Sequence, residues 1–196
     1  MFLVGVNGIM FGHQREKEEY VISLDFLPHG YPFDNQPGYK KTPIVQAIGK
    51  LNFTLLELVP KKDIFIQPLE EIYIGDGKRD KIHHINGRLE INKLTATSKS
   101  QLKFVVEDLI NNDENRFVQF FNEAQPLSTR MHQLELLPGL GKKHMWEILD
   151  ERKGDPFKNL DDLKKRVKLL PDPKKAIVKR ILNELSGKEK HKVFVA

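Results

Sequence analysis

A short turn in the last third of the chain, residues 137–143, holds the residues best suited to bind an anion. The first backbone N–H groups of a helix have no partner inside the helix, and together with the helix dipole they attract negative charge. Gly141 has no side chain that could cap these donors, and Gly139 lets the chain bend. The adjacent lysines add positive charge at the same point. The spacing therefore predicts a phosphate-binding site made of Gly139, Leu140, Gly141, Lys142 and Lys143.

The sequence Leu-Pro-Gly-Leu-Gly-Lys-Lys of this turn resembles the hairpin of the helix-hairpin-helix family of nucleic-acid-binding motifs. A repeat supports the resemblance, because a shift of 33 positions places LPGLGKKHMWEIL (137–149) over LPDPKKAIVKRIL (170–182). We expect each copy to be a helix, a hairpin and a helix, with residues 129–136 and 162–169 forming the first helix of each. The predicted unit is a compact bundle of four helices.

The second copy differs at its helix start. Asp172 suits the N-cap position and Pro173 suits the first helical position, so the amides there are expected to be occupied by the protein itself. We predict that this copy is mainly structural, with Lys174 and Lys175 at most touching a neighbouring phosphate. For the first copy, the alternative is a plain tight turn between two packed helices.

Helical spacing predicts which side chains of this region are buried. The expected core residues are Met145, Trp146, Ile148, Leu149, Ile177, Val178, Ile181, Leu182 and Leu185. We expect Lys174, Lys175, Lys179 and Arg180 to lie mostly outside.

The region from Tyr20 to Asn92 alternates with a period of two and predicts a small antiparallel β-barrel. Strands are expected at 20–26, 43–50, 53–59, 63–67 and 70–74, and Tyr20, Ile22, Leu24 and Phe26 are expected to share one face. Asn86-Gly87 is typical of a two-residue hairpin turn. This turn would place Ile82, His84, Leu89 and Ile91 in the core.

After Asn92 the period becomes helical. The segment TSKSQLKFVVEDLINND predicts one helix, and residues 114–124 predict a second helix with Phe117, Phe120 and Phe121 on one side. We expect both helices to cover the open side of the barrel, and Pro126 to end them.

Composition narrows the classes of function. The chain has 196 residues and no Cys, which excludes disulfides, thiolate zinc sites and cysteine nucleophiles. No stretch approaches the length of a membrane span, and no signal peptide is recognisable, so we expect a soluble cytoplasmic protein without membrane contacts. A second Met at position 10 suggests Met10 as the natural start, and the sequence leaves Met1 open as the alternative. Residues 126–196 hold 17 Lys and Arg against 10 Asp and Glu, a net charge of +7, which indicates a polyanionic partner.

Two loops are weaker candidates for nucleic-acid contacts. Lys78 and Arg79 follow a Gly-Asp-Gly sequence, which is equally typical of an ordinary turn. Tyr31, Tyr39, Lys40 and Lys41 combine rings with charge in the loop 27–43, a mixture suited to stacking single-stranded bases, although the rings could simply cover the barrel. The seven His residues show no metal-ligand spacing, and neither a metal site nor a cofactor is predicted.

Three longer stretches make the chain from residue 18 resemble an archaeal family known as domain of unknown function 655. They are YIGDGKRDKI, RFVQFFNEAQPLSTRMHQLELLPGLGKKHMWEILDERK and DPKKAIVKRIL. The resemblance implies an α+β fold with a barrel like that of oligonucleotide/oligosaccharide-binding (OB) proteins, followed by a tandem helix-hairpin-helix domain. It also implies nucleic-acid binding, and the neighbourhood of its genes to translation genes favours RNA over DNA.

The expected organisation is an N-terminal extension at 1–17, a barrel at 18–92, linking helices at 93–125, the tandem helix-hairpin-helix domain at 126–187 and a tail at 188–196. The tail is expected either to add a strand to the barrel or to lie free. The function expected is a nucleic-acid-binding protein with little sequence preference and no catalytic motif. A nucleic-acid-processing enzyme and an adaptor for ribosomal or transcription-complex proteins are the alternatives.

Overall fold

The computed structural model describes residues 16–32, 37 and 41–196, and the expectation about Met10 and residues 1–15 of the N-terminal extension lie outside these residues. Their contacts divide into two compact units, which we describe separately. The barrel unit comprises residues 16–109 and Ile181–Ala196, and the helical unit comprises Ile110–Arg180. The fold is α+β, as predicted. The division falls inside two helices rather than at the boundaries expected from the sequence.

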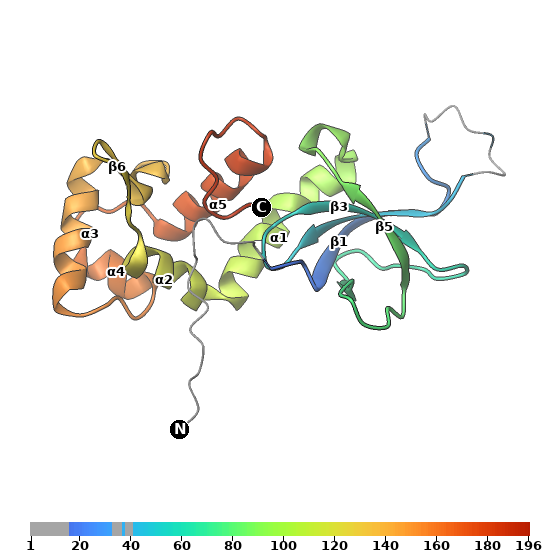
Figure 1. Ribbon diagram of the computed structural model, residues 1–196, viewed down its shortest axis with the longest axis horizontal. Coiled ribbons are helices and arrows are strands. Elements are labelled where there is room, and N and C mark those ends of the chain that lie inside the picture. The colour runs from blue at the N-terminus through green and yellow to red at the C-terminus, as the bar shows by residue number, and fades with distance from the viewer. Residues whose placement is uncertain (1–15, 33–36, 38–40) are drawn as a thin grey trace, which may run out of the picture. The chain divides into compact units, whose positions relative to one another are not determined.

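The barrel unit is built on a curled antiparallel sheet of five strands, in the order β4-β1-β2-β3-β5 (Figure 1). The strands are β1 (Tyr20–Leu27), β2 (Ile44–Gly49), β3 (Leu55–Pro60), β4 (Glu71–Tyr73) and β5 (Ile82–Arg88). Among the described residues β4 pairs with β1 and β5 with β3, so the sheet forms a half-barrel that is open between β4 and β5. The expected strand at 63–67 is absent, because Asp63 adopts a positive φ of 60° and turns the chain.

The predicted hairpin at Asn86-Gly87 is wrong. Residues 82–88 form one continuous strand, and their backbone pairs along β3 instead of folding back on itself. Gly87 has a φ of +151° and lies opposite Glu57, while Asn86 is the extra residue of a β-bulge. Pairing with a full neighbouring strand bonds more backbone groups than a two-residue turn, and the bulge uses the same freedom of Gly that suggested a turn. His84 is consequently exposed rather than in the core.

The predicted face of β1 is also wrong. Val21 is completely buried, whereas Tyr20 is exposed. A second bulge, between Ser23 and Asp25, shifts the alternation, so that Val21 and Phe26 both pack on the same core cluster. This cluster lines the inside of the half-barrel and consists of Val21, Val45, Ala47, Leu56, Leu58, Ile66, Ile72, Ile74 and Ile82.

Helix α1 (Ala96–Asn112) covers the other face of the sheet with its first turns. The buried side chain of Gln46 on β2 accepts hydrogen bonds from the Thr95 amide at 2.9 Å and from the Ser98 hydroxyl at 2.8 Å. The Thr95 hydroxyl also donates to Asp25 at 2.6 Å. Helix α2 (Glu114–Glu123), which was expected to cover the barrel as well, belongs to the helical unit.

The C-terminal residues are part of the barrel unit. The carboxylate of Glu184 is buried and accepts hydrogen bonds from the amides of Val193, Phe194 and Val195 at 2.8–2.9 Å. The amide of Ala196 donates to the carbonyl of Asn52. Residues 188–196 thus neither form a strand nor lie free, and both expectations for the tail are wrong.

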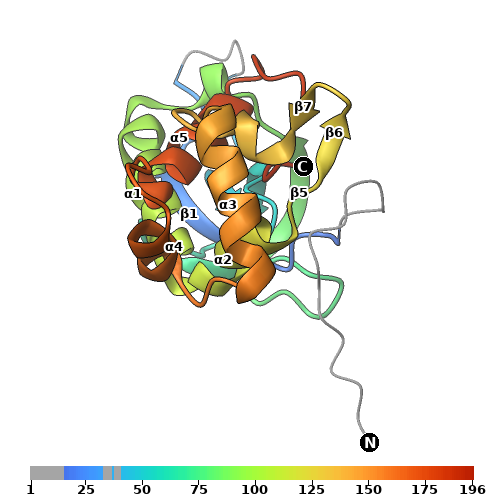
Figure 2. The same ribbon diagram turned by 90° about the vertical axis from the view of Figure 1, so that its left-hand side faces the viewer.

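The helical unit contains α2, α3 (Lys142–Gly154), α4 (Leu160–Arg166) and most of α5 (Pro173–Leu185). Figure 2 shows α3 toward the viewer, with the ribbon of β6 (Pro126–Ser128) and β7 (Met131–His132) beside it. The helix predicted at 129–136 is wrong, because β7 is followed only by the 3-10 turn η3 (Gln133–Leu136). Pro126 cannot continue a helix, and the β6–β7 pair uses the backbone groups that follow it.

Candidate nucleic-acid interface

The predicted anion site is at the start of α3. Gly141 is the N-cap residue in extended conformation, and no side chain caps the helix there. Its carbonyl accepts the first helical hydrogen bond, from the Met145 amide at 3.0 Å. Within the described chain, the amides of Lys142, Lys143 and His144 have no acceptor. Three backbone donors therefore point out of the helix end without a protein partner.

The turn before α3 is held by a buried side chain and a left-handed glycine. Leu140 is buried, and its amide donates to the carbonyl of Leu137 at 3.1 Å. Gly139 has a φ of +91°, a conformation that glycine adopts without strain. Leu140 thus anchors the turn, and its own amide is used inside it.

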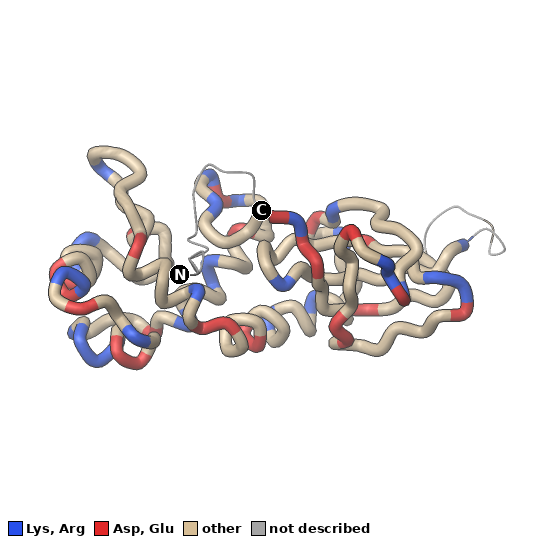
Figure 3. The backbone as a smooth tube through the Cα atoms, turned by 60° about the horizontal axis from the view of Figure 1, so that its bottom comes forward, with Lys and Arg blue, Asp and Glu red and all other residues tan. Residues whose placement is uncertain are grey.

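The lysines of the site are available to a ligand. Lys142 and Lys143 are both exposed, and neither forms an ion pair with any residue that the structure describes. Lys and Arg recur along the rest of the helical unit, interspersed with acidic residues (Figure 3). The start of α3 combines two such cations with the open amides.

The second hairpin is closed, as its sequence predicts. The Lys175 amide donates to Asp172 Oδ1 at 3.0 Å, and the Ala176 amide donates to the Asp172 carbonyl at 3.0 Å. Pro173 is buried at the first position of α5. Relative to the ungapped repeat, α5 begins two residues earlier than α3, which makes Asp172 the counterpart of Gly141 at the N-cap.

The two hairpins lie against each other. A Cβ added to Gly139 would lie 3.3 Å from Cγ of Pro171, a contact tighter than most side chains make. Gly139 therefore serves both the left-handed turn and the close approach of the second hairpin. This contact supports the prediction that the second hairpin is structural.

Two predictions about side chains of the hairpins are wrong. Trp146 was expected in the core, but 60% of its surface is exposed, because Met145 and Ile148 take the buried side of α3. Arg180 was expected outside, but only 3% of it is exposed, and its Nη1 donates to the carbonyl of Leu136 at 3.0 Å. Arg180 thus holds the end of η3.

Trp146, which the sequence placed in the core, instead lies on the surface beside the two lysines. It follows Lys143 by three residues and Lys142 by four on α3, the spacing at which side chains of a helix are neighbours. An exposed indole beside two lysines suits base stacking next to a bound phosphate. That spacing, visible in the sequence, was the available signal.

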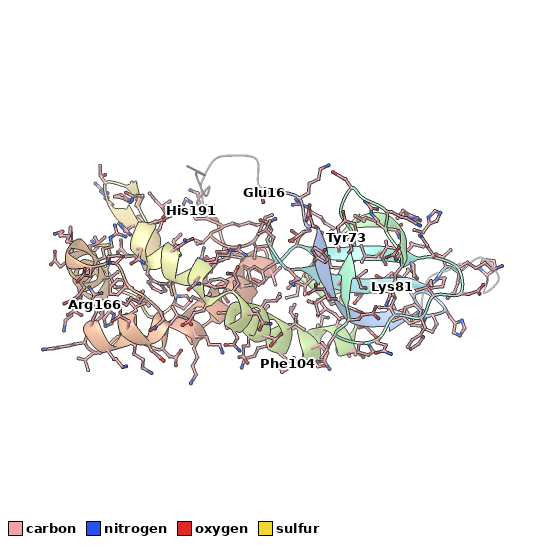
Figure 4. The ribbon with its side chains drawn as sticks, turned by 90° about the horizontal axis from the view of Figure 1, so that it is seen from below. Glu16, Tyr73, Lys81, Phe104, Arg166 and His191 are labelled. Atoms are coloured by element: carbon pink, nitrogen blue, oxygen red, sulfur yellow. The ribbon has the colours of Figure 1, made fainter. Side chains whose placement is uncertain are left out.

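Lys174 and Lys175 differ in their surroundings. Lys174 is half-buried and donates to Asn111 Oδ1, so its charge is partly used inside the helical unit. Lys175 and Lys179 are exposed. Arg166 (Figure 4) is likewise used internally, since it donates to the carbonyl of Asp155 and stacks on the ring of Phe157.

A histidine closes the η3 turn directly before the hairpin. Nδ1 of His132 accepts from the Leu134 amide at 3.2 Å, and the His132 amide donates to Glu135 at 2.8 Å. Burial and then the charge of Arg152 lower the pKa of His132, against the opposing effect of Glu135. The neutral ring is therefore the form that fits this reciprocal cap.

The loop 74–81 is organised by an aromatic ring. The hydroxyl of Tyr73 (labelled in Figure 4) accepts from the Gly77 amide at 3.0 Å, and a Cβ on Gly75 would lie 2.4 Å from the same hydroxyl. Arg79 Nε donates to the Gly75 carbonyl at 2.9 Å. Of the two residues predicted to contact nucleic acid here, Arg79 is therefore already engaged by the loop itself. Lys78 remains exposed.

The loop after β1 is described only in part. Tyr31 donates to Glu57 at 2.6 Å, and Nζ of Lys41 donates to the Tyr31 carbonyl at 2.8 Å, so the structure does bring these two predicted residues together. Tyr39 and Lys40 lie outside the described residues. Across the described ranges, no group of three or more His, Asp or Glu side chains could hold a metal ion, and no helix is long and apolar enough to cross a membrane.

Comparison with known proteins finds one relative of known structure and one relative by sequence. A crystal structure of Af1531 from Archaeoglobus fulgidus matches with a TM-score of 0.81 and 44% identity, over 91% of this chain and all of that one. The uncharacterized protein MJ0038 of Methanocaldococcus jannaschii is 43% identical over 178 residues, which are 91% of this chain and 79% of the relative. A model of the family described as protein of unknown function (DUF655) matches residues 17–196. As its YIGDGKRDKI and LPGLGKK stretches suggested, the chain belongs to the DUF655 family.

Proposed function

We propose that this protein binds nucleic acid, with RNA preferred, and that the start of α3 holds one backbone phosphate. The observation that carries the proposal is that the amides of Lys142, Lys143 and His144, which follow the N-cap residue Gly141, have no acceptor in the described chain. A phosphate oxygen is the natural acceptor for amides at a helix start. Lys142 and Lys143 then neutralise the strand, and Trp146 stacks on a neighbouring base.

The arrangement of η3, turn and α3 functions in this proposal as a helix-hairpin-helix element whose first helix is reduced to a 3-10 turn. The second hairpin, closed by Asp172, supports the first through Pro171. The half-barrel serves as an OB-like platform for further nucleotides. Contacts to phosphate carry no sequence information, so we expect weak sequence preference from the hairpin.

The test uses the single Trp of the chain as a reporter. Because Trp146 is exposed beside the site, its fluorescence should fall as a single-stranded RNA is added to the full-length protein. Titrations at several salt concentrations should give a slope of log K against log salt of roughly −3, the value for about four neutralised phosphates. DNA of the same sequence should bind more weakly. Binding that does not depend on salt would contradict the proposal.

A further inference from the structure

The barrel unit contains a surface pocket, and no sequence pattern predicted that its lining residues lie together. Its volume is about 460 Å³, within the usual range for small-molecule sites. Its lining comes from the loop after β1, from β3, from the end of β5 and from the 3-10 turn η2 (Ile91–Lys93). The lining residues are Tyr31, Glu57, Asn86, Gly87, Arg88, Leu89 and Lys93.

The β-bulge at the end of β5 helps to create this pocket. Gly87 lies opposite Glu57 of β3, and a Cβ placed on Gly87 would meet no atom within 4 Å. The space over Gly87 is therefore open. Asn86, the extra residue of the bulge, presents its side chain to Glu57, the residue opposite Gly87.

One wall of the pocket is polar and held in place. Glu57 accepts from Tyr31 at 2.6 Å with one carboxylate oxygen and from Asn86 Nδ2 at 2.7 Å with the other. The Tyr31 oxygen itself accepts from the buried amide of Gln46 at 3.0 Å, and His84 Nε2 lies 2.9 Å from Asn86 Oδ1. The negative charge of Glu57 is thus engaged by two donors, and the wall has a defined geometry before any ligand arrives.

Two cations also line the pocket. Arg88 and Lys93 are exposed, and neither side chain bonds or pairs with another residue in the part of the chain that the structure describes. Elsewhere in the same unit, Lys50, Lys81 and Lys103 are each paired with a glutamate. Arg88 and Lys93 thus bring two cations without an acidic partner into the lining of one pocket, where both can reach the same anion, and the planar guanidinium of Arg88 suits a phosphate.

We propose that this pocket binds one nucleotide, with its base against Tyr31, Gly87 and Leu89 and its phosphate on Arg88 and Lys93. The combination of the Tyr31 ring, the Leu89 side chain, a fixed polar wall and two cations matches a molecule that is planar and aromatic at one end and anionic at the other. A free nucleotide and the phosphorylated end of a strand both present a base and a phosphate, so the pocket would recognise the two sources by the same contacts. This inference goes beyond the hairpin proposal and does not depend on it.

The experiment is a calorimetric titration of the full-length protein with AMP, CMP, GMP and UMP, and with adenosine and inorganic phosphate as partial ligands. At least one monophosphate should bind saturably, and more tightly than either adenosine or phosphate. Arg88→Ala and Lys93→Ala should each weaken it roughly tenfold, the effect of losing one charge-assisted hydrogen bond. Lys62→Ala, which removes an exposed lysine of the same unit outside the pocket, should leave it unchanged.

Equal losses in Lys62→Ala and Lys93→Ala would overturn the proposal, as would phosphate alone binding as tightly as every monophosphate. A 5′-phosphorylated tetranucleotide, compared with its 5′-hydroxyl form, separates the two sources. Preference for the phosphorylated strand over AMP indicates a strand end, and the reverse indicates a free nucleotide. Repeating the nucleotide titration with Gly141→Asp distinguishes the two sites. This variant changes only the start of α3, so its affinity for the monophosphate should equal that of the unmodified protein, whether or not the hairpin proposal holds.

Discussion

Gly141 and Asp172 occupy the same N-cap position at the starts of α3 and α5, yet only Asp172 closes its helix with its own side chain. The Lys175 amide donates to Asp172, whereas the corresponding amides of α3 have no acceptor in the described chain. One repeat unit thus carries an open helix end and the other a closed one, and the two are in contact through Gly139 and Pro171.

Gly141→Asp should abolish much of the nucleic-acid affinity. The new carboxylate would bond the amides that a phosphate needs and would repel the phosphate itself, so we expect a loss of roughly tenfold to a hundredfold. The φ of −96° at Gly141 is ordinary for any residue, and a Cβ there meets nothing, so the fold should be retained. Fluorescence anisotropy with a labelled single-stranded RNA measures the effect.

Asp172→Gly is the matched control for that experiment, since it removes a cap at the closed helix end. Its affinity for the same RNA should equal that of the unmodified protein. If both variants lost affinity to the same extent, the assignment of the first hairpin as the binding one would fail.

Substitutions of Asp172 should lower the stability of the helical unit, although they are expected to leave the nucleic-acid affinity unchanged. Asp172→Ala should lower the free energy of unfolding by about 1 kcal/mol, and Asp172→Gly by only a few tenths, because glycine is itself a tolerated N-cap residue. The ion pair of Asp172 with Lys164, at 3.9 Å and on the surface, should add little. Urea unfolding followed by circular dichroism checks this order, and equal losses for the two variants would contradict it.

Acidification should weaken the cap before the first hairpin. Since the pKa of His132 lies below its ordinary value of 6.5 in the folded chain, the unfolded chain takes up the proton first. The contribution of this group to stability is therefore complete above about pH 6.5 and is lost as the pH falls toward the folded pKa. His132→Asn keeps an acceptor for the Leu134 amide but does not titrate in this range. The variant should lose less unfolding free energy than the unmodified protein between pH 7 and pH 5 in urea titrations, and identical losses would refute the role of His132.

Removing the acceptor for the C-terminal amides should destabilise the barrel unit. Glu184→Ala leaves three buried amides without their carboxylate, and we expect a loss on the order of 3 kcal/mol in the free energy of unfolding. Glu184→Gln retains one acceptor oxygen and should lose less. Glu90→Ala, at an exposed glutamate of the same unit, serves as the control, and its thermal unfolding should be nearly unchanged. A Glu184→Ala protein as stable as this control would show that the tail is not anchored through the carboxylate.

Local sequence determined the features that a short segment decides alone. The open start of α3 follows from a glycine before two lysines, and the closed start of α5 follows from Asp172-Pro173, because capping involves only residues within one turn of each other. Helices α1 and α2 and strands β2, β3 and β4 were predictable for the same reason, since their apolar periods are local.

Tertiary structure decided whatever depends on a partner far away in the chain. Asn86-Gly87 became a bulge in a strand because β3 offered its backbone for pairing, and Arg180 is buried because the carbonyl of Leu136 lies within its reach. Trp146 lies outside because Met145 and Ile148 occupy the buried side of α3, and the last residues pack because Glu184 accepts their amides. A sequence period cannot distinguish these outcomes, because each depends on which distant surface is present to complete the contact.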